Sequence, residues 1–338
     1  MRFSALGDVA LTVPVLHSLA EQNPGVQVHM FSRPFFEPLF RHIPRLEFNG
    51  ADIDRTYKGV GGLTRLFGKM RKHNPQAVAD LHDVLRTKYL RMLFRATGTP
   101  VRVIDKGRAE KKELIRRGAL QSRPLRSTHE RYADVFRALG LQIDLSRYRP
   151  VKPPLSGQTQ TFLNLFRGQK IIGFAPLAKH PGKQYPLGGS RELIRQLLDA
   201  QSDLVFLLFG APSEKKLLDT MISDPNRVFN LAGMFDFPAE LEIISRLRLM
   251  IAMDSGNGHL GAIYGVPVFT IWGITHPYAG FAPLGQDTSM QIHPPLEKFP
   301  RIPCSVYGNK ICPGYEKIWD ELPPEAIADK LFPVIQHL

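Results

Sequence analysis

The stretch 247–272, LRLMIAMDSGNGHLGAIYGVPVFTIW, indicates the fold more clearly than any other part of the chain. An apolar run ends at the Asp-Ser-Gly turn 254–256, a short helix-forming segment follows, and a second apolar run covers 266–272. This order of strand, turn, helix and strand is the repeating unit of a parallel sheet. Ligands of such sheets bind beyond the carboxyl ends of the strands, where the turn 254–256 is expected to lie.

The residues of this turn suit a phosphate group. Ser255 and Gly256 can present backbone N–H groups at the N-terminus of the helix, which attracts anions. His259 lies one turn further along and can face the same ligand. The alternative is that Asp254 and Ser255 only cap the helix. We favour a ligand site, because small residues and a histidine converge at the end of a strand.

Composition restricts the class of protein. A chain of 338 residues with 43% hydrophobic residues predicts a globular protein of two domains. No apolar run reaches the roughly 20 residues of a membrane helix, and the first residues do not have the pattern of a signal peptide. The two cysteines, Cys304 and Cys312, fit a reducing cytoplasm, and we expect them to form neither a disulfide framework nor a metal site.

The net charge of +13 favours an anionic partner, although part of it can serve solubility alone. Much of the positive charge gathers between residues 86 and 131. The basic residues of this region are Arg86, Lys88, Arg91, Arg95, Arg102, Lys106, Arg108, Lys111, Lys112, Arg116, Arg117, Arg123, Arg126 and Arg131.

Strands and helices are predicted to alternate in both halves of the chain. In the first half we expect strands at 1–3, 27–31, 77–81 and 101–104, and helices at 9–20 (bent at Pro14), 87–96 and 129–139. In the second half we expect strands at 171–174, 204–209, 228–231, 247–253 and 266–272, and helices at 190–200, 214–222 and 240–246. This alternation predicts two doubly wound α/β domains, 1–150 and 169–322, joined by a linker at 151–168 that is rich in proline.

The turn RFSALGD, residues 2–8, is expected on the first domain. Its single glycine does not make the GxGxxG fingerprint of dinucleotide-binding proteins. Asp8 stands where a helix cap belongs, so capping alone is one interpretation. The other interpretation is a general base placed at the ligand site.

The chain resembles glycosyltransferase family 9, the heptosyltransferases of the lipopolysaccharide core. The motifs that carry the resemblance are RFSALGD at 2–8, KQYP at 183–186, GAPSE at 210–214, NLAG at 230–233, DSG at 254–256 with His259, and WGITHP at 272–277. Each motif is weak alone, but the ordered series is specific and spans the chain.

The resemblance implies a GT-B fold with two Rossmann-like domains and an active site between them. It implies metal-independent, inverting transfer of heptose from a nucleotide-activated donor, ADP-heptose, to an anionic lipid A-type glycolipid, with no cofactor. Asp8 matches the catalytic base and Lys183 the lysine that binds donor phosphate. Asp254, Ser255, Gly256 and His259 match the donor loop. Looser matches place Glu214 near the nucleotide and Thr275 beside the phosphates.

The chemistry agrees with these roles. A sugar hydroxyl must lose its proton as the new bond forms, which a nearby carboxylate promotes. Without a metal, the charge of the departing diphosphate must be met by Lys183 and by helix N-termini. Lys179 can also reach the phosphates, or it is an ordinary solvated lysine. The letters Asp-Ile-Asp at 52–54 follow no predicted buried strand, which fits a metal-free mechanism.

Part of the basic region is expected to receive the acceptor. Arg86, Lys88, Lys106 and Arg108 lie near predicted strand ends, where their side chains can reach the ligand site; the alternative for each is an exposed charged face. The same surface can touch the anionic cytoplasmic leaflet of the inner membrane. We therefore expect a cytoplasmic protein in peripheral contact with that membrane.

The sequence departs from the family pattern in places. The family has several apolar residues before the first turn, whereas only Met1 precedes Arg2 here, and Tyr185 replaces a tryptophan. In GT-B folds the last helix, here 323–338, often crosses back to the first domain. The motifs leave the donor sugar open.

Three rival functions remain at this point. Another GT-B transferase with a different nucleotide sugar would share the same motifs. A nucleic-acid-binding protein is disfavoured, because aromatic residues are not interleaved with the basic region. A nicotinamide-dependent oxidoreductase is disfavoured by the missing glycine fingerprint.

Overall fold

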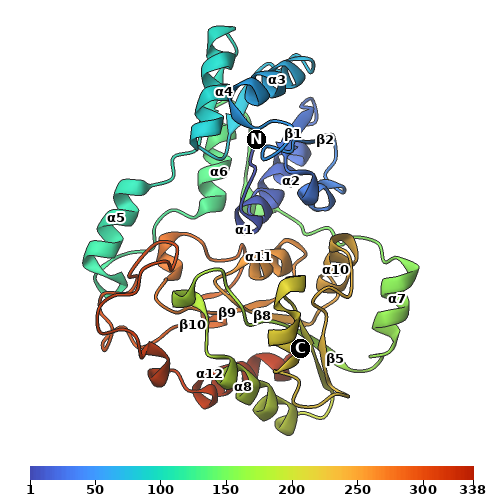
Figure 1. Cartoon of the computed structure of the whole chain (residues 1–338), viewed down its shortest axis with the longest axis vertical. Coiled ribbons are helices and arrows are strands. Elements are labelled where there is room, and N and C mark those ends of the chain that lie inside the picture. Colours follow the sequence, from blue (N-terminus) through green and yellow to red (C-terminus); the bar gives the residue numbers. More distant parts are fainter. The chain divides into compact units, whose positions relative to one another are not determined.

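The computed structural model describes all 338 residues and divides into two compact units (Figure 1). Unit 1 contains Met1–Lys106 and Arg126–Pro150, and unit 2 contains Gly107–Leu125 and Val151–Leu338. The expected first domain, 1–150, differs from unit 1 in the segment 107–125. This segment is bound to unit 2 through backbone hydrogen bonds, from Ala119 to Ile302 and from Leu125 to Tyr278.

Unit 2 is built on one parallel sheet of six strands in the order β10-β9-β8-β5-β6-β7. The strands are β5 (Lys170–Ala175), β6 (Leu204–Leu208), β7 (Val228–Asn230), β8 (Leu249–Met253), β9 (Val268–Ile271) and β10 (Gln291–Ile292). Every residue of β6, β8 and β9 is buried. Their continuous apolar runs follow from this, because a parallel sheet is covered on both faces.

The chain changes direction across this sheet between β5 and β8. From β5 it proceeds outward to β6 and β7, and it then returns to β8 on the other side of β5 and continues to β9 and β10. A ligand site is expected outside the carboxyl ends of the two strands at such a switch point.

Seven α-helices belong to unit 2. They are α5 (Arg108–Arg117), α7 (Gly157–Asn164), α8 (Leu187–Ala200), α9 (Lys215–Asp219), α10 (Phe237–Ile244), α11 (Gly256–Ile263) and α12 (Pro324–Gln336). The stretch 151–168, expected to be a linker, contains α7. Ser156 caps this helix, Phe162 packs edge-on against Phe235, and Phe166 packs against Phe229 with the rings tilted.

The last helix, which we expected to return to the first domain, belongs to unit 2. Helix α12 packs against α8 within unit 2. Its Ile327, Leu331 and Ile335 are fully buried in the core that also contains Leu193 and Leu197 of α8. Burying this apolar face within unit 2 is the physical reason for its position.

Unit 1 has two pairs of parallel strands, β1 (Val28–Ser32) with β2 (Leu46–Gly50), and β3 (Val78–Asp80) with β4 (Val101–Val103). The segment 1–3 lies between the pairs, because the N–H of Arg2 donates to Phe31 and Met1 accepts from Leu81. The expected first strand therefore takes the central position, although its bonds are too few to form a regular strand.

The helices of unit 1 are α1 (Leu6–Ala10), α2 (Val13–Gln22), α3 (Gly59–Arg71), α4 (Leu85–Ala96) and α6 (Thr128–Arg137). We predicted one bent helix over 9–20, but the structure has two, α1 and α2. Pro14 lies in the first turn of α2, where its missing N–H costs no hydrogen bond.

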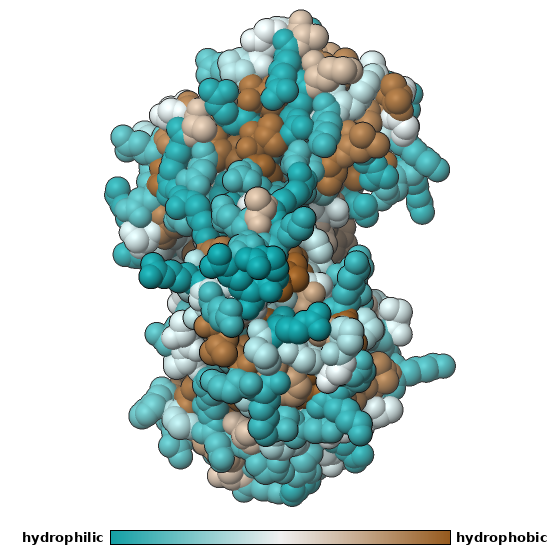
Figure 2. All heavy atoms as spheres, turned by 90° about the vertical axis from the view of Figure 1, so that its left-hand side faces the viewer, coloured by the Kyte–Doolittle hydropathy of each residue, from teal (hydrophilic) through white to brown (hydrophobic).

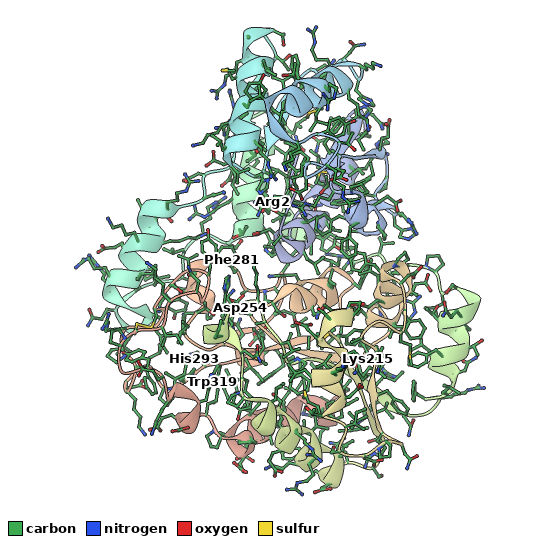
Figure 3. The ribbon with its side chains drawn as sticks, in the orientation of Figure 1. Arg2, Lys215, Asp254, Phe281, His293 and Trp319 are labelled. Atoms are coloured by element: carbon green, nitrogen blue, oxygen red, sulfur yellow. A yellow bond between two sulfur atoms is a disulfide. The ribbon has the colours of Figure 1, made fainter.

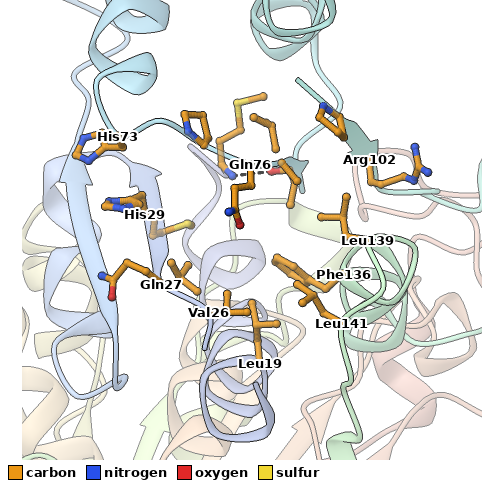
Figure 4. A pocket seen from close by; sticks show the side chains of 18 of the residues that line it. Leu19, Val26, Gln27, His29, His73, Gln76, Arg102, Phe136, Leu139 and Leu141 are labelled. Carbon is orange, nitrogen blue, oxygen red and sulfur yellow. Dashed lines mark hydrogen bonds between the residues drawn. The ribbon is translucent and has the colours of Figure 1, made fainter. Parts of the chain in front are cut away.

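A cavity of about 730 Å³ opens in unit 1 beside the segment 1–3 (Figure 4). Its walls include His29 of β1, His73 after α3, and Phe136, Leu139 and Leu141 at the end of α6 and beyond.

The surface near α5 is largely hydrophilic, with small hydrophobic patches (Figure 2). Among the residues of α5 only Lys111 and Leu114 are buried. None of the helices combines the length and the apolar character that crossing a membrane requires.

Candidate active site

An ion pair lies at the switch point of unit 2. Lys183 follows β5 and Asp254 follows β8, and Lys183 Nζ is 2.7 Å from Asp254 Oδ2. The side chains are 14% and 7% exposed, so both charges are largely removed from water. Asp254 is labelled in Figure 3. Lys183 and Asp254, which the sequence analysis assigned to the donor site, therefore form an ion pair with each other.

A third loop, after β9, joins the same place. The N–H of Ile274 donates to the carbonyl of Gly182 at 2.8 Å, next to Lys183. The approach is so close that a Cβ on Gly273 would collide with that carbonyl oxygen. Thr275 follows in this loop, 1% exposed, and its hydroxyl oxygen has no hydrogen-bond partner.

The N-terminus of α11 faces this region without a side-chain cap. Ser255 occupies the cap position in an extended conformation, but its hydroxyl makes no cap hydrogen bond and is buried without a partner. The carboxylate of Asp254 is engaged by Lys183 instead. Neither Asp254 nor Ser255 therefore caps the helix through its side chain, in contrast to the alternative interpretation. Gly256 opens α11, and His259 is buried within its first turns.

The loop that contains Cys304, Gly308 and Cys312 covers Lys183. A Cβ on Gly308, whose φ is +74°, would stand 2.5 Å from Cγ of Lys183. The N–H of Cys304 donates to the carbonyl of Ile274 at 2.8 Å, which fastens the loop to the one after β9. Cys304 and Cys312 form a disulfide, contrary to our expectation. The chain reverses between them, so their Cα atoms are 5.4 Å apart, within the usual range for a disulfide.

Tyr185, which stands where the resemblance predicts a tryptophan, follows Lys183 in the same loop and anchors this loop to the segment 319–322. Its hydroxyl donates to the carbonyl of Leu322 at 2.8 Å, and its ring meets Trp319 edge-on. Burial raises the pKa of Tyr185 to about 12. The ring is 2% exposed and belongs to the hydrophobic core of unit 2, two residues after Lys183.

Two further donor-site predictions lie in neighbouring loops. Glu214 follows β6, and its Oε2 accepts the N–H of Ala211 at 2.6 Å, which stabilises the turn there. Lys179 lies in the loop after β5 and is exposed. Neither side chain is part of the Lys183–Asp254 pair.

The predicted base, Asp8, is held by Arg2 in unit 1. Arg2 Nη2 lies 2.5 Å from Asp8 Oδ2, and the N–H of Ala5 donates to the same oxygen at 3.5 Å. Asp8 therefore does cap the start of α1, as one interpretation expected. Both contacts fall on Oδ2, which leaves Oδ1 to accept a proton, and the side chain is 31% exposed.

Arg2 is fixed in its turn by the core of unit 1. Its Nη1 donates to the carbonyl of Leu81 at 2.9 Å, and its guanidinium lies 5.9 Å from the centre of the Tyr132 ring. Its side chain is only 7% exposed. Sequence reasoning placed Arg2 in a motif but gave it no role.

Sequence reasoning also missed His82, which follows β3. Its Nε2 lies 3.5 Å from the hydroxyl of Ser4, in the turn that carries Asp8. Burial is the main cause that lowers the pKa of His82 to about 3, and the positive charges of Arg2, Lys106 and Arg86 contribute to the same shift. The ring is therefore neutral at physiological pH.

The predicted acceptor residues divide between the units. Arg86 and Lys106 are near His82; Arg86 pairs with Asp54 at 3.2 Å, and Lys106 donates to the carbonyl of Asp83 at 3.2 Å. Lys88 is exposed on α4. Arg108 opens α5 and belongs to unit 2.

Comparison with known proteins identifies the family of this chain. Residues 63–301 match the sequence profile of glycosyltransferase family 9 (heptosyltransferase). The lipopolysaccharide core heptosyltransferase OpsX of Haemophilus influenzae is 20% identical over 285 residues, which cover 82% of this chain and 79% of OpsX.

Solved structures of similar proteins cover nearly the whole chain. A family 9 glycosyltransferase of Veillonella parvula has a TM-score of 0.76 at 17% identity, covering 99% of this chain and 96% of its own. The ADP-heptose lps heptosyltransferase II of E. coli has a TM-score of 0.66 at 18% identity, covering 100% and 99%. E. coli heptosyltransferase WaaC with ADP has a TM-score of 0.63 at 19% identity, covering 99% and 96%.

These likenesses establish the fold as GT-B, which confirms the prediction from the resemblance. The match to the family profile extends over most of the chain and includes the Lys183 loop and the turn 254–256. The chain belongs to glycosyltransferase family 9, the heptosyltransferase family.

Proposed function

We propose that this glycosyltransferase moves heptose from ADP-heptose to a hydroxyl group of an anionic lipid A-type glycolipid, in the synthesis of the lipopolysaccharide core. The observation that carries the proposal is the buried Lys183–Asp254 pair beside the uncapped N-terminus of α11. The similarity to OpsX and to WaaC with ADP supports the choice of acceptor class and donor.

The donor diphosphate is assigned to unit 2. Lys183 supplies a positive charge, and the first N–H groups of α11 supply the partial charge of a helix N-terminus. The buried hydroxyls of Ser255 and Thr275 lack protein partners, and phosphate oxygens would satisfy them. Gly256 allows close approach to the backbone, and His259, Glu214 and Lys179 are assigned to the surroundings of the nucleotide.

The base is assigned to Asp8. In a single displacement the acceptor oxygen attacks the anomeric carbon while the bond to the diphosphate breaks, which inverts the configuration. The hydroxyl proton passes to Asp8 Oδ1, and Arg2 holds the carboxylate in place through Oδ2. The charge that develops on the diphosphate is met by Lys183 and α11, so this scheme needs no metal and no cofactor.

The acceptor is assigned to the basic residues Arg86, Lys88, Lys106 and Arg108. Phosphates and acidic sugars of a glycolipid would pair with them, and Arg86 would exchange Asp54 for the ligand. A protein that acts on such a lipid is expected in the cytoplasm, in peripheral contact with the inner membrane.

The donor is tested by calorimetry with a panel of ADP-heptose, ADP, UDP, GDP, NAD and single-stranded DNA, followed by a transfer assay with the selected donor. We expect binding of ADP-heptose and ADP only. Preference for UDP or GDP would keep the fold and change the donor, and binding of DNA alone would overturn the proposal.

Metal independence is tested with a chelator. Transfer at 25 °C is expected to be unchanged by EDTA, because Lys183 and α11 take the place of a metal at the diphosphate. Strong inhibition that Mg²⁺ or Mn²⁺ reverses would contradict this part of the proposal.

A further inference from the structure

Two histidines and a glutamate meet on one face of the β1–β2 pair in unit 1. His29 of β1 stands opposite Glu47 of β2 in the register of the two strands. His73, just after α3, reaches the same place from the helix that covers this face, and its ring centre lies 4.2 Å from that of His29. His29 and His73 are both on the wall of the cavity in Figure 4.

The ligand atoms of these side chains converge. His29 Nδ1 is 3.3 Å from Glu47 Oε2, and His73 Nδ1 is 3.9 Å from Glu47 Oε1. All three ligand atoms lie within 4.8 Å of one another. Two ligands of a tetrahedral zinc ion, each about 2.0–2.1 Å from the metal, are roughly 3.3 Å apart. Small side-chain movements would therefore bring the three atoms around one ion.

The surroundings favour a cation over a simple hydrogen-bonded cluster. His29 Nδ1 is buried and makes no hydrogen bond, although the carboxylate of Glu47 is close to it. The amide of Asn49 donates to Glu47 Oε1 at 3.1 Å, which orients the carboxylate as an outer partner of a metal ligand does. The histidine side chains are 25% and 21% exposed, so an ion and a water ligand can enter.

We propose that His29, Glu47 and His73 form a binding site for a divalent transition metal ion of the zinc type. Two imidazoles and one carboxylate are a ligand set that zinc accepts, with water in the fourth position. The site joins β1, β2 and the end of α3, and it lies in unit 1, whereas the donor residues lie in unit 2. Its role is to stabilise unit 1, and it is independent of the proposed transfer reaction.

The test is calorimetric titration of ZnCl₂ into the tag-free protein after EDTA treatment and desalting. We expect one zinc ion per chain and a higher Tm with zinc. Glu47→Gln and His73→Ala remove a ligand and should each weaken binding by more than about 100-fold, since loss of an outer partner alone costs 10–100-fold. Asn49→Ala should weaken it less. Co²⁺ in place of zinc should give the absorption bands of a tetrahedral site.

The matched control is His42→Ala, which removes an exposed histidine outside the cluster. This variant should bind zinc as the unaltered protein does. Far-UV circular dichroism verifies that each variant is folded, and Tm without metal separates loss of the site from loss of the fold. The proposal is overturned if the protein takes up no zinc, or if Glu47→Gln and His73→Ala, both folded, bind it as tightly as His42→Ala.

Discussion

Each unit has an ion pair near its central strand or segment, and the two carboxylates differ in their exposure to solvent. In unit 2, Lys183 follows the central strand β5, and Asp254 follows the next strand across the switch point. In unit 1, the turn with Asp8 follows the central segment 1–3, and Arg2 is its partner. The acid is 7% exposed in unit 2 and 31% exposed in unit 1.

The difference in exposure suits Asp254 and Asp8 to different roles. Asp254 is buried against its lysine and is suited to holding that lysine in place for an anion. Asp8 keeps one oxygen free of protein contacts and is accessible, as a proton acceptor must be. In the proposed mechanism, the same motif of a carboxylate with a cation therefore serves positioning in unit 2 and proton removal in unit 1.

The comparison is tested most strongly by Asp8→Asn. The amide keeps the shape of the side chain but is no base, so kcat should fall by about 10²–10⁴-fold while donor affinity stays unchanged. Transfer kinetics and donor calorimetry on the same preparation give both values. Near-normal turnover would show that Asp8 is not the base.

A second test is Asp254→Ala, which leaves the ammonium of Lys183 largely buried without its partner. Breaking a buried pair from one side costs about 3–5 kcal/mol, so Tm should drop clearly in a thermal unfolding experiment. The double variant Lys183→Met with Asp254→Leu is the control and should recover most of the loss. An unchanged Tm in Asp254→Ala would show that the pair is not buried in solution.

Glu240 is a third carboxylate for this comparison, and burial is the cause of its shifted pKa. Burial raises the pKa of Glu240 in α10 to about 7, from an ordinary value of 4.5. The folded state then binds more protons than the unfolded state between these values, so its stability falls as pH rises through that window. Glu240→Gln should remove up to about 3 kcal/mol of this loss. Unfolding curves at several pH values check it; parallel pH dependence in both proteins would contradict the raised pKa.

The smallest effect is expected for Tyr185→Phe, beneath the Lys183 loop. It removes one hydrogen bond and leaves the carbonyl of Leu322 without that donor, at a cost of about 1 kcal/mol. For a unit of this size, that lowers Tm by about 2–4 °C. Tyr307→Phe, which changes an exposed tyrosine, is the control. Equal Tm values for the two variants would mean that the hydroxyl of Tyr185 contributes nothing.

Sequence reasoning predicted the elements whose apolar pattern is strong. The runs that became β6, β8 and β9 are continuous and fully buried, and they were located to within a few residues. Strand β2, with the sequence LEFNG, is short and partly polar, and α3 contains several glycines, so local pattern did not reveal either.

The candidate site was predicted as residues but not as contacts. The motifs named Asp8, Lys183 and Asp254, but the pattern did not show that Asp8 pairs with Arg2 of its own turn. The partner of Lys183 is Asp254, in a segment far away in the chain, so packing between distant segments fixes that pair. The same holds for His82, whose proximity to Ser4 spans 78 positions. The disulfide was missed because two cysteines alone give no indication of the reversal between them.

The central claim is that donor binding belongs to the pair in unit 2 and proton removal to the pair in unit 1. Calorimetric titration of ADP-heptose into Lys183→Ala and Asp8→Asn, side by side, tests it most directly. The account predicts much weaker binding by Lys183→Ala and unchanged binding by Asp8→Asn. Unchanged affinity in Lys183→Ala would contradict the account.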